Sequence, residues 1–371
     1  MHATRPETSR SPLTTVTAWC AVLVLAAGLI ATRYVEPMEL LRPGPTARDQ
    51  ALEASMAFLD RYVDPDGRVV RRDEDGSTVS EGQAYGLLVA AAIGDEATFE
   101  RILAWQEEHL LRDDGLLAWH WHDGSVDPEV APDADLDAIL ALMVAAERFD
   151  EPAHRQRAGE MARAIDEHLV AEVGDDLLLL PGAWAQGPPL TWNPSYVFPT
   201  TFDALARTLP DTGRWERLRT SSYAQLARVM TGQPGLPPDW AEVDEDGEVT
   251  PVGLEDPPRF AYDAVRVPIR LAVDCDERGR ELAAGLRPFF ATQQHLAAEY
   301  DLDGSARVDY AHPTMLVAAA AAEHAAGDER AAEDLLDRAQ ELDERHPTYY
   351  GAAWVALGRL LLTTDALQRC E

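Results

Sequence analysis

Three acidic residues stand where a long loop meets the start of an apolar, helix-like segment: Glu81, Asp133 and Asp263. If those segments form stacked helical hairpins, the three carboxyl groups meet at one rim of the molecule. Carboxyl groups at one cleft can divide acid and base work, because one protonates a leaving oxygen while another deprotonates water. The chemistry that suits this set is hydrolysis of a glycosidic bond. Each residue also has a simpler explanation, since an acidic residue at a helix start stabilises the helix dipole.

The position of Glu81 creates a physical tension. Glu81 follows Ser80, the expected N-cap of its helix. A helix N-terminus favours the ionised carboxylate and lowers its pKa, whereas a general acid must hold its proton. Partial burial and a second carboxylate nearby would raise the pKa of one group and leave its neighbour ionised. We expect Asp133 to be that neighbour of Glu81.

The chain from residue 48 onward shows apolar residues at three- and four-residue spacing and little strand-like alternation. This pattern predicts an all-α protein of about twelve helices. The expected helices span residues 48–63, 80–93, 96–110, 133–149, 153–170, 199–209, 214–231, 262–273, 277–290, 313–326, 329–344 and 349–362.

The connections between these segments alternate between short and long. Short turns join antiparallel neighbours, so the helices pair into hairpins. A closed ring of six hairpins would place every long loop on one face, where the even-numbered helices begin. Those even helices are richer in apolar and small residues, as an inner ring packed on both sides requires. The pattern therefore predicts an (α/α)6 barrel. An open solenoid is the alternative, but no fixed-period repeat supports it.

Aromatic residues are frequent in the long loops. Rings stack on the apolar faces of sugars, so aromatics that line a cleft suit a glucan chain. The alternative is that some of them only anchor the loops to the core. The candidates for substrate contact from the loops are Trp119, Trp121, Trp192, Tyr196 and Trp240.

Arg266 lies three residues beyond Asp263, on the same face of the expected helix. It is placed to orient that carboxylate or to bind a sugar hydroxyl. A plain ion pair without a further role is equally compatible with the spacing.

Composition limits the possible partners. The 371 residues carry a net charge of −33, and no lysine is present. Such an acidic surface repels nucleic acid and anionic lipid but is compatible with a neutral polymer. Three cysteines, of which Cys20 lies in an apolar N-terminal run, leave at most one disulfide pair. We expect no metal and no cofactor, because the histidines and cysteines show no ligand-like spacing.

The N-terminus resembles an export signal. Arg5 and Arg10 precede an uncharged, largely apolar stretch at 11–32. A cleaved signal peptide and a retained membrane anchor both fit, and both place the rest of the chain outside the cytoplasm. We therefore expect a signal or anchor at residues 1–35, a proline-rich linker at 36–47 and a catalytic domain at 48–371. Membrane contact would involve only the N-terminal segment.

Several motifs, taken together in this order, resemble family 8 of the glycoside hydrolases, which includes bacterial endoglucanases of the cellulose-synthesis operon. The resemblance spans roughly residues 51–362. Its motifs are Ser80-Glu81-Gly82-Gln83, Asp133-Ala134-Asp135-Leu136-Asp137, Asn193-Pro194-Ser195-Tyr196, Pro238-Asp239-Trp240, Tyr262-Asp263-Ala264-Val265-Arg266-Val267-Pro268 and Tyr349-Tyr350.

The resemblance implies an (α/α)6 barrel that cleaves β-1,4-glucan with inversion at the anomeric carbon. It makes Glu81 the proton donor and Asp263 the base, while Asp133 holds a distorted sugar. It also places Tyr196, Tyr262 and Arg266 in support of this site. The implied partners are a β-glucan chain and a cellulose synthase complex.

Two positions depart from the family pattern. Pro132 stands where Ser or Thr usually precedes the Asp, and Ala84 stands where Ser or Gly is frequent. Pro132 could alter the hydrogen bonding of Asp133. Xylan, chitosan and mixed-linkage glucan remain alternative substrates. A glycan-binding factor with weak catalysis, which assists a polysaccharide synthase, remains an alternative function.

Overall fold

The computed structural model describes residues 44–371 except 210–212, 255, 369 and 371. Residues 47–371 form one compact unit, which contains the expected catalytic domain. The expected signal or anchor and most of the expected linker lie outside the described residues. No helix in the described part of the chain is long and apolar enough to cross a bilayer.

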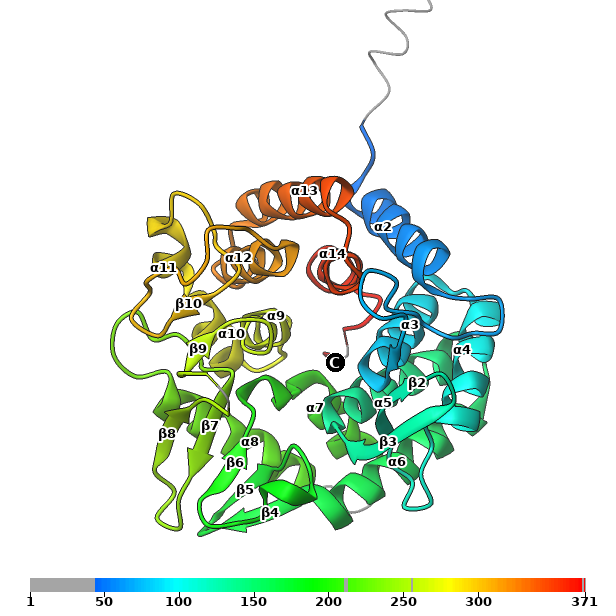
Figure 1. Cartoon of the computed structure of the whole chain (residues 1–371), viewed down its shortest axis with the longest axis horizontal. Helices are drawn as coiled ribbons and strands as arrows, with labels where there is room; N and C mark the ends of the chain where they lie inside the picture. The colour runs from blue at the N-terminus through cyan, green and yellow to red at the C-terminus, as the bar shows by residue number, and fades with distance from the viewer. Residues whose placement is uncertain (1–43, 210–212, 255, 369, 371) are drawn as a thin grey trace, which may run out of the picture. The chain divides into compact units, whose positions relative to one another are not determined.

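The helices form two concentric rings (Figure 1). The outer ring consists of α2 (Ala47–Tyr62), α4 (Glu96–His109), α6 (Pro152–Leu169), α8 (Gly213–Val229), α10 (Glu277–Ala284) and α13 (Glu329–Arg345). The inner ring consists of α3 (Ser80–Ile93), α5 (Pro132–Arg148), α7 (Pro199–Thr208), α9 (Arg266–Ala272), α12 (Pro313–Ala325) and α14 (Tyr349–Thr363). The last inner helix packs against α2 and α3, so the ring closes. The predicted (α/α)6 barrel is confirmed.

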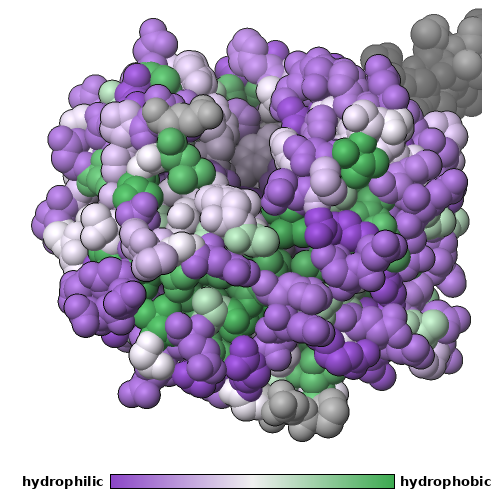
Figure 2. Space-filling view, turned by 60° about the horizontal axis from the view of Figure 1, so that its bottom comes forward, coloured by the Kyte–Doolittle hydropathy of each residue, from purple (hydrophilic) through white to green (hydrophobic). Residues whose placement is uncertain are grey.

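The composition of each helix explains its ring. The inner helix α3 buries every residue from Gly82 to Ala92, and α12 buries every residue from Pro313 to Ala322. The outer helix α13 buries only Ala332, Leu336 and Ala339. A helix that contacts protein on all sides must be apolar all round, whereas a surface helix needs one apolar stripe. The exterior carries the charge, and Figure 2 shows hydrophilic residues surrounding smaller hydrophobic patches.

The turns within hairpins follow standard capping chemistry. Gly94 ends α3 with φ of 81°, and Gly327 follows α12 with the same φ. This left-handed conformation costs glycine little, so it stops a helix sharply. Asp95 and Asp328 then cap the next helices, because each side chain accepts a hydrogen bond from a backbone N–H of the first turn.

The long loops contain short strands that the sequence pattern did not predict. The three-stranded sheets are β1 (Thr78–Val79), β2 (Ala118–His122) and β3 (Ser125–Val130), and β6 (Leu190–Trp192), β7 (Trp240–Val243) and β8 (Val249–Val252). The two-stranded sheets are β4 (Val170–Val173) and β5 (Asp176–Leu179), and β9 (Arg259–Phe260) and β10 (Tyr300–Asp301). Two 3₁₀ turns, η1 (Ala183–Ala185) and η2 (Pro194–Tyr196), complete the loops. These strands are too short for a periodic signal, and the pairs β1–β2, β6–β7 and β9–β10 join different loops.

Two predicted helices differ from the observed ones by more than two residues at an end. The helix expected at 262–273 begins only at Arg266, because residues 262–265 form a turn. The helix expected at 277–290 is split into α10, which ends before Gly285, and the short α11 (Arg287–Thr292). Pro288 lies in the first turn of α11, where a proline removes no helical hydrogen bond, so the proline suits a new helix start.

The disulfide question that the sequence left open is answered by the structure. Cys275, in the turn between α9 and α10, is bonded to Cys370 near the C-terminus. The segment that leads to Cys370 includes Leu367, which is buried in the core. The bond therefore fixes the end of the chain to the barrel.

Candidate active site

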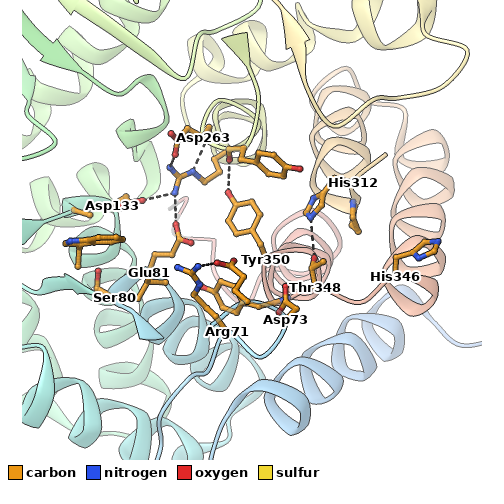
Figure 3. A pocket seen from close by; sticks show the side chains of 18 of the residues that line it. Arg71, Asp73, Ser80, Glu81, Asp133, Asp263, His312, His346, Thr348 and Tyr350 are labelled. Carbon is orange, nitrogen blue, oxygen red and sulfur yellow. Dashed lines mark hydrogen bonds and ion pairs between the residues drawn. The ribbon is translucent and has the colours of Figure 1, made fainter. Parts of the chain in front are cut away.

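A cavity of about 950 Å³ opens at the rim where the inner helices begin. Its walls contain Glu81, Asp133 and Asp263, together with Tyr196, Tyr262, Arg266 and Trp119. Figure 3 shows Glu81, Asp133 and Asp263 converging on the cavity from separate parts of the chain. The spatial convergence that the spacing of the loops predicts is therefore present.

Glu81 lies in the first turn of α3. The helix begins at Ser80 with Val79 as the N-cap, so the expected capping role of Ser80 is wrong. The neighbouring position 82 requires glycine for steric reasons, because a Cβ there would lie 2.7 Å from the Tyr349 hydroxyl. Tyr85, one turn further along α3, directs its hydroxyl to Glu81 at 3.3 Å. The Glu81 side chain is 25% exposed and faces the cavity.

Asp133 lies one position into α5. Pro132 is the first residue of that helix, where the missing N–H of proline costs nothing. One oxygen of Asp133, Oδ2, accepts a bond of 2.7 Å from Arg266. The other, Oδ1, is buried and has no hydrogen-bond partner among the described residues. Pro132 therefore leaves the ion pair of Asp133 intact, and Oδ1 is buried without a partner.

Asp263 occupies the turn that precedes α9 instead of the helix itself. Its backbone carbonyl accepts a hydrogen bond from the N–H of Arg266 at 3.1 Å. Its side chain is 34% exposed, and Oδ1 accepts a bond of 2.6 Å from Arg266. The three-residue spacing of Asp263 and Arg266 thus produces the contact that the sequence suggested.

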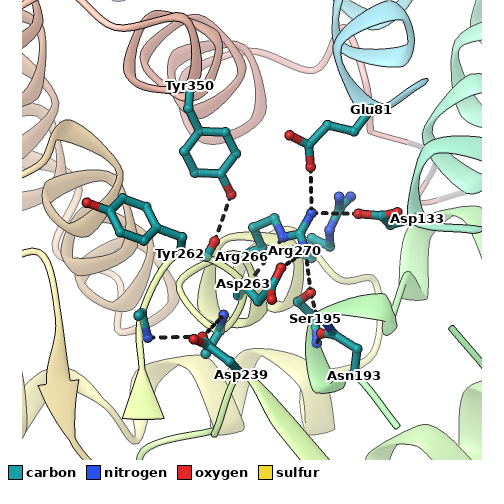
Figure 4. A network of polar contacts seen from close by, with 12 residues as sticks. Glu81, Asp133, Asn193, Ser195, Asp239, Tyr262, Asp263, Arg266, Arg270 and Tyr350 are labelled. Carbon is teal, nitrogen blue, oxygen red and sulfur yellow. Dashed lines mark hydrogen bonds and ion pairs between the residues drawn. The ribbon is translucent and has the colours of Figure 1, made fainter. Parts of the chain in front are cut away.

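Arg266 joins all three carboxylates (Figure 4). Its Nη1 contacts Glu81 Oε2 at 3.1 Å and Asp133 Oδ2 at 2.7 Å, and its Nη2 contacts Asp263 and the Ser195 hydroxyl. Because Glu81 and Asp263 share one guanidinium, the contacting oxygens lie no more than about 8 Å apart. This bound is compatible with the roughly 6.5–9.5 Å that an inverting pair of carboxyl groups requires.

The site raises the pKa values of two of these carboxyl groups. Burial raises the pKa of Glu81 to about 7; Arg266 opposes this rise, and the charges of Asp133 and Asp263 add to it. Burial likewise raises the pKa of Asp263 to about 6, with Arg266 opposing and the charges of Asp239 and Asp133 assisting. Burial is therefore the main cause of both raised pKa values, and at Glu81 it outweighs the lowering of the pKa expected at a helix start. The neighbouring carboxylates add to the rise.

The predicted aromatic contacts divide into two groups. Trp119, 37% exposed, lines the cavity together with Tyr196 and Tyr262. Trp192 is 2% exposed and belongs to the core, so the expected stacking of Trp192 on a sugar is wrong. It anchors its loop, which is the alternative that the sequence left open.

Two further tryptophans do not line the main cavity. Trp121 packs edge-on against Trp105 at 5.5 Å, and Arg68 covers its ring. Trp121 therefore packs the loop that carries Trp119 against the outer helix α4. Trp240 lines a smaller hollow of about 260 Å³, which also reaches Asp263.

The structure adds residues that sequence reasoning did not assign to the site. The cavity is also lined by Arg71, Asp73, Glu74, Tyr310, His312, His346, Thr348, Tyr349 and Tyr350. Arg71 and Glu74 form an ion pair, and burial lowers the pKa of His312 to about 4. The signal that could have found them is their position, because all of them lie in the connections that lead into α3, α12 and α14 or in the first turn of α14.

Ser195 and Asp239 also act at the site, although the sequence indicates them only as parts of motifs. Ser195 accepts a bond of 2.7 Å from Arg266, and Asn193 accepts bonds from the amide and the hydroxyl of Ser195. Asp239 binds the turn that carries Asp263. Within the described chain, no group of three or more His, Cys, Asp or Glu side chains is arranged to hold a metal ion.

The closed helical barrel and the carboxyl groups around its rim are compatible with a glycoside hydrolase. Residues 49–364 match the sequence model of glycosyl hydrolases family 8. The chain belongs to this family.

Individual relatives agree with this assignment. A probable endoglucanase of Novacetimonas hansenii is 32% identical over 231 residues, which cover 60% of this chain and 67% of that protein. The structure of the endo-β-1,4-glucanase CMCax from Acetobacter xylinum aligns with a TM-score of 0.74 and 28% identity, covering 85% of this chain and 98% of that one. A β-1,3-1,4-glucanase from Paenibacillus sp. X4 has a TM-score of 0.77 at 17% identity, over 86% of this chain and 93% of that one, and shows the fold alone.

Proposed function

We propose that this chain is an inverting endo-β-1,4-glucanase that hydrolyses a cellulose-like β-glucan. The observation that carries the proposal is the convergence of Glu81 and Asp263 on Arg266 inside one open cavity. The names of the family relatives support the substrate class, since an endoglucanase and an endo-β-1,4-glucanase are among them.

In this mechanism Glu81 is the general acid. With a pKa of about 7, a large share of Glu81 stays protonated in weakly acidic solution, although Arg266 lies beside it. Glu81 donates its proton to the glycosidic oxygen as the bond to the anomeric carbon breaks. Loss of the leaving group as a neutral alcohol removes the barrier of expelling an alkoxide.

Asp263 is the general base. Its pKa of about 6 lies below that of Glu81, so at intermediate pH the acid holds a proton while the base is ionised. Asp263 takes a proton from a water molecule, whose oxygen attacks the anomeric carbon on the face opposite the leaving group. The product is therefore the inverted anomer.

Asp133 holds the sugar at the cleavage point. Its buried and unpartnered Oδ1 faces a cost unless a ligand donates a hydrogen bond to it. A sugar hydroxyl in the cavity, which Asp133 and Tyr196 both line, can supply that donor once the Asp133 side chain turns toward it. Arg266 keeps Asp133 in place through Oδ2.

The substrate assignment is tested with a panel of defined oligosaccharides and polymers. We expect wild type to cleave internal bonds of cellohexaose and to release reducing ends from soluble cellulose derivatives. Glu96→Gln is a matched control, because Glu96 is an exposed residue in the first turn of an outer helix. Release of reducing ends only from xylan, chitosan or mixed-linkage glucan would overturn the cellulose assignment. Retained binding with equally negligible hydrolysis by wild type and Glu81→Gln would favour a glycan-binding factor.

We also propose that the chain is exported, as the N-terminal sequence suggests. The bond between Cys275 and Cys370 supports this location, because disulfides form and persist in oxidising compartments. Protease treatment of spheroplasts, whose outer barrier is opened while the cytoplasmic membrane stays intact, tests the proposal in cells that express the full chain with a C-terminal tag. We expect digestion of the tagged domain; full protection until lysis would contradict export. Association with a cellulose synthase complex stays a prediction.

A further inference from the structure

The turn that carries Asp263 is held from behind by a second carboxylate. Asp239 is 6% exposed, and its Oδ1 accepts hydrogen bonds from the backbone N–H groups of Ala261 at 3.1 Å and Ala264 at 3.0 Å. These two donors bracket Asp263 in the sequence. A single oxygen therefore fixes both ends of the turn.

The other oxygen of Asp239 is also engaged. Its Oδ2 contacts Arg259 Nε at 3.1 Å, while the backbone N–H of Asp239 donates to the Arg259 carbonyl at 2.8 Å. Arg259 in turn contacts Asp256 and Glu299, so its single charge is shared among three carboxylates. Arg259 therefore neutralises the ionised Asp239 only in part, and burial raises the pKa of Asp239 itself.

On the opposite side, the turn is held by α14. The Tyr350 hydroxyl donates to the carbonyl of Tyr262 at 2.7 Å. The turn between these two contacts is closed by its own bond from Val265 N–H to the Ala261 carbonyl at 2.9 Å. A segment that is bonded on both sides cannot shift Asp263 without breaking hydrogen bonds, and a misplacement of about 1 Å can cost roughly 10²-fold in rate.

We propose that Asp239 is a positioning residue for catalysis, which holds the turn of Asp263 through two backbone amides and adjusts the basicity of Asp263 through its charge. This inference rests on the proposed role of Asp263 as the base. It assigns to Asp239 no contact with substrate.

The charged groups around Asp263 come from several elements. Arg266 contacts it directly, while Asp239, just before β7, and Asp133 of α5 raise its pKa. Glu81 faces the same guanidinium from α3. Removal of the charge of Asp239 leaves Arg266 in place, so the pKa of Asp263 should fall.

The test compares Asp239→Asn, Asp239→Ala and wild type in the full chain. Asparagine keeps an oxygen that can accept both amide bonds but has no charge. For Asp239→Asn we expect the acidic limb of the profile of kcat/KM against pH to move down by about one pH unit. We expect kcat at the optimum to fall only about 3-fold, since a weaker base removes a proton less efficiently. For Asp239→Ala, which loses both acceptors, we expect kcat to fall by about 10²-fold with KM nearly unchanged.

Asp274→Asn is the matched control. Asp274 is equally buried, accepts a backbone N–H and lies just beyond the other end of α9. We expect it to leave the acidic limb in place. An unmoved limb in Asp239→Asn, or an equal shift in Asp274→Asn, would overturn the inference. Asp239→Asn can be measured even if Asp239→Ala fails to fold. A wild type that does not cleave β-1,4-glucan would instead refute the proposed function.

Discussion

The barrel interior contains two layers of ion pairs, one helical turn apart on the same two helices. In the upper layer, at the rim, Asp133 of α5 faces Arg266 of α9. In the lower layer Asp137 faces Arg270, with both guanidinium nitrogens at 2.9 Å from the two carboxylate oxygens. The lower pair is covered by an aromatic ring, because the guanidinium carbon of Arg270 lies 3.5 Å from the centroid of the Phe198 ring. The two layers share their elements and their chemistry but not their balance of charge.

The number of carboxylates for each guanidinium differs between the two layers, and we relate this difference to their roles in stability and in catalysis. In the lower layer one carboxylate meets one guanidinium in a bidentate pair, the arrangement that best offsets the cost of burying both charges. In the upper layer Arg266 alone serves Glu81, Asp133 and Asp263. Burial raises the pKa of Asp137 in the lower layer too, but the upper carboxylates face the main cavity, and their mutual repulsion adds to the rise in the pKa values of Glu81 and Asp263.

The largest expected effect comes from removing the acid in the upper layer. Glu81→Gln keeps the size of the side chain but has no proton to give. We expect kcat on cellohexaose to fall by about 10³-fold with KM within about 3-fold, as measured by release of reducing ends. An aryl cellobioside with a strongly acidic leaving phenol needs no protonation, so it should lose much less. An equal loss on both substrates would show that Glu81 is not the acid.

The same substitution made in both layers tests their difference directly. A lysine has one nitrogen in place of the two that divide these contacts, so Arg266→Lys should lower kcat by about 10²-fold. Arg270→Lys should leave kcat within about 3-fold but lower the free energy of unfolding by about 1–2 kcal/mol, because one of two parallel bonds is lost. Steady-state rates and urea unfolding measure the two outcomes. Similar losses of kcat in both variants would remove the distinction between the layers.

A smaller effect is expected from pH alone. Asp263 must be ionised and Glu81 must be protonated, so activity should rise as pH passes the pKa of Asp263 and fall as it passes that of Glu81. With pKa values of about 6 and about 7, the profile of kcat/KM should be a narrow bell between them. A profile that keeps rising above about pH 8 would exclude Glu81 as the proton donor.

The sequence predicts what local patterns determine. The apolar run of α3 and the glycine that ends it predict an inner helix, and its observed limits, Ser80–Ile93, agree with the expected 80–93. Arg266 can be identified from the sequence because it lies three residues from Asp263. Its contacts with Glu81 and Asp133 cross 185 and 133 residues of the chain, so no local spacing could indicate them.

The errors have the same origin. Trp192 and Trp119 both stand in long loops, and only the packed structure shows that one is buried and the other exposed. The sequence predicts Asp263 in a helix because the apolar pattern begins before α9, whereas the backbone bonds to Asp239 hold that segment as a turn. Burial and pairing between distant loops decided these cases, and the sequence of one chain does not contain that information in local form.

The most direct test of the account is the stereochemistry of the first product. Proton NMR of a fresh digest of cellohexaose resolves the two anomers before they interconvert. If Glu81 and Asp263 act from opposite faces of the sugar, the α anomer appears first and the β anomer grows in later. Appearance of the β anomer first would contradict the proposed pairing of acid and base.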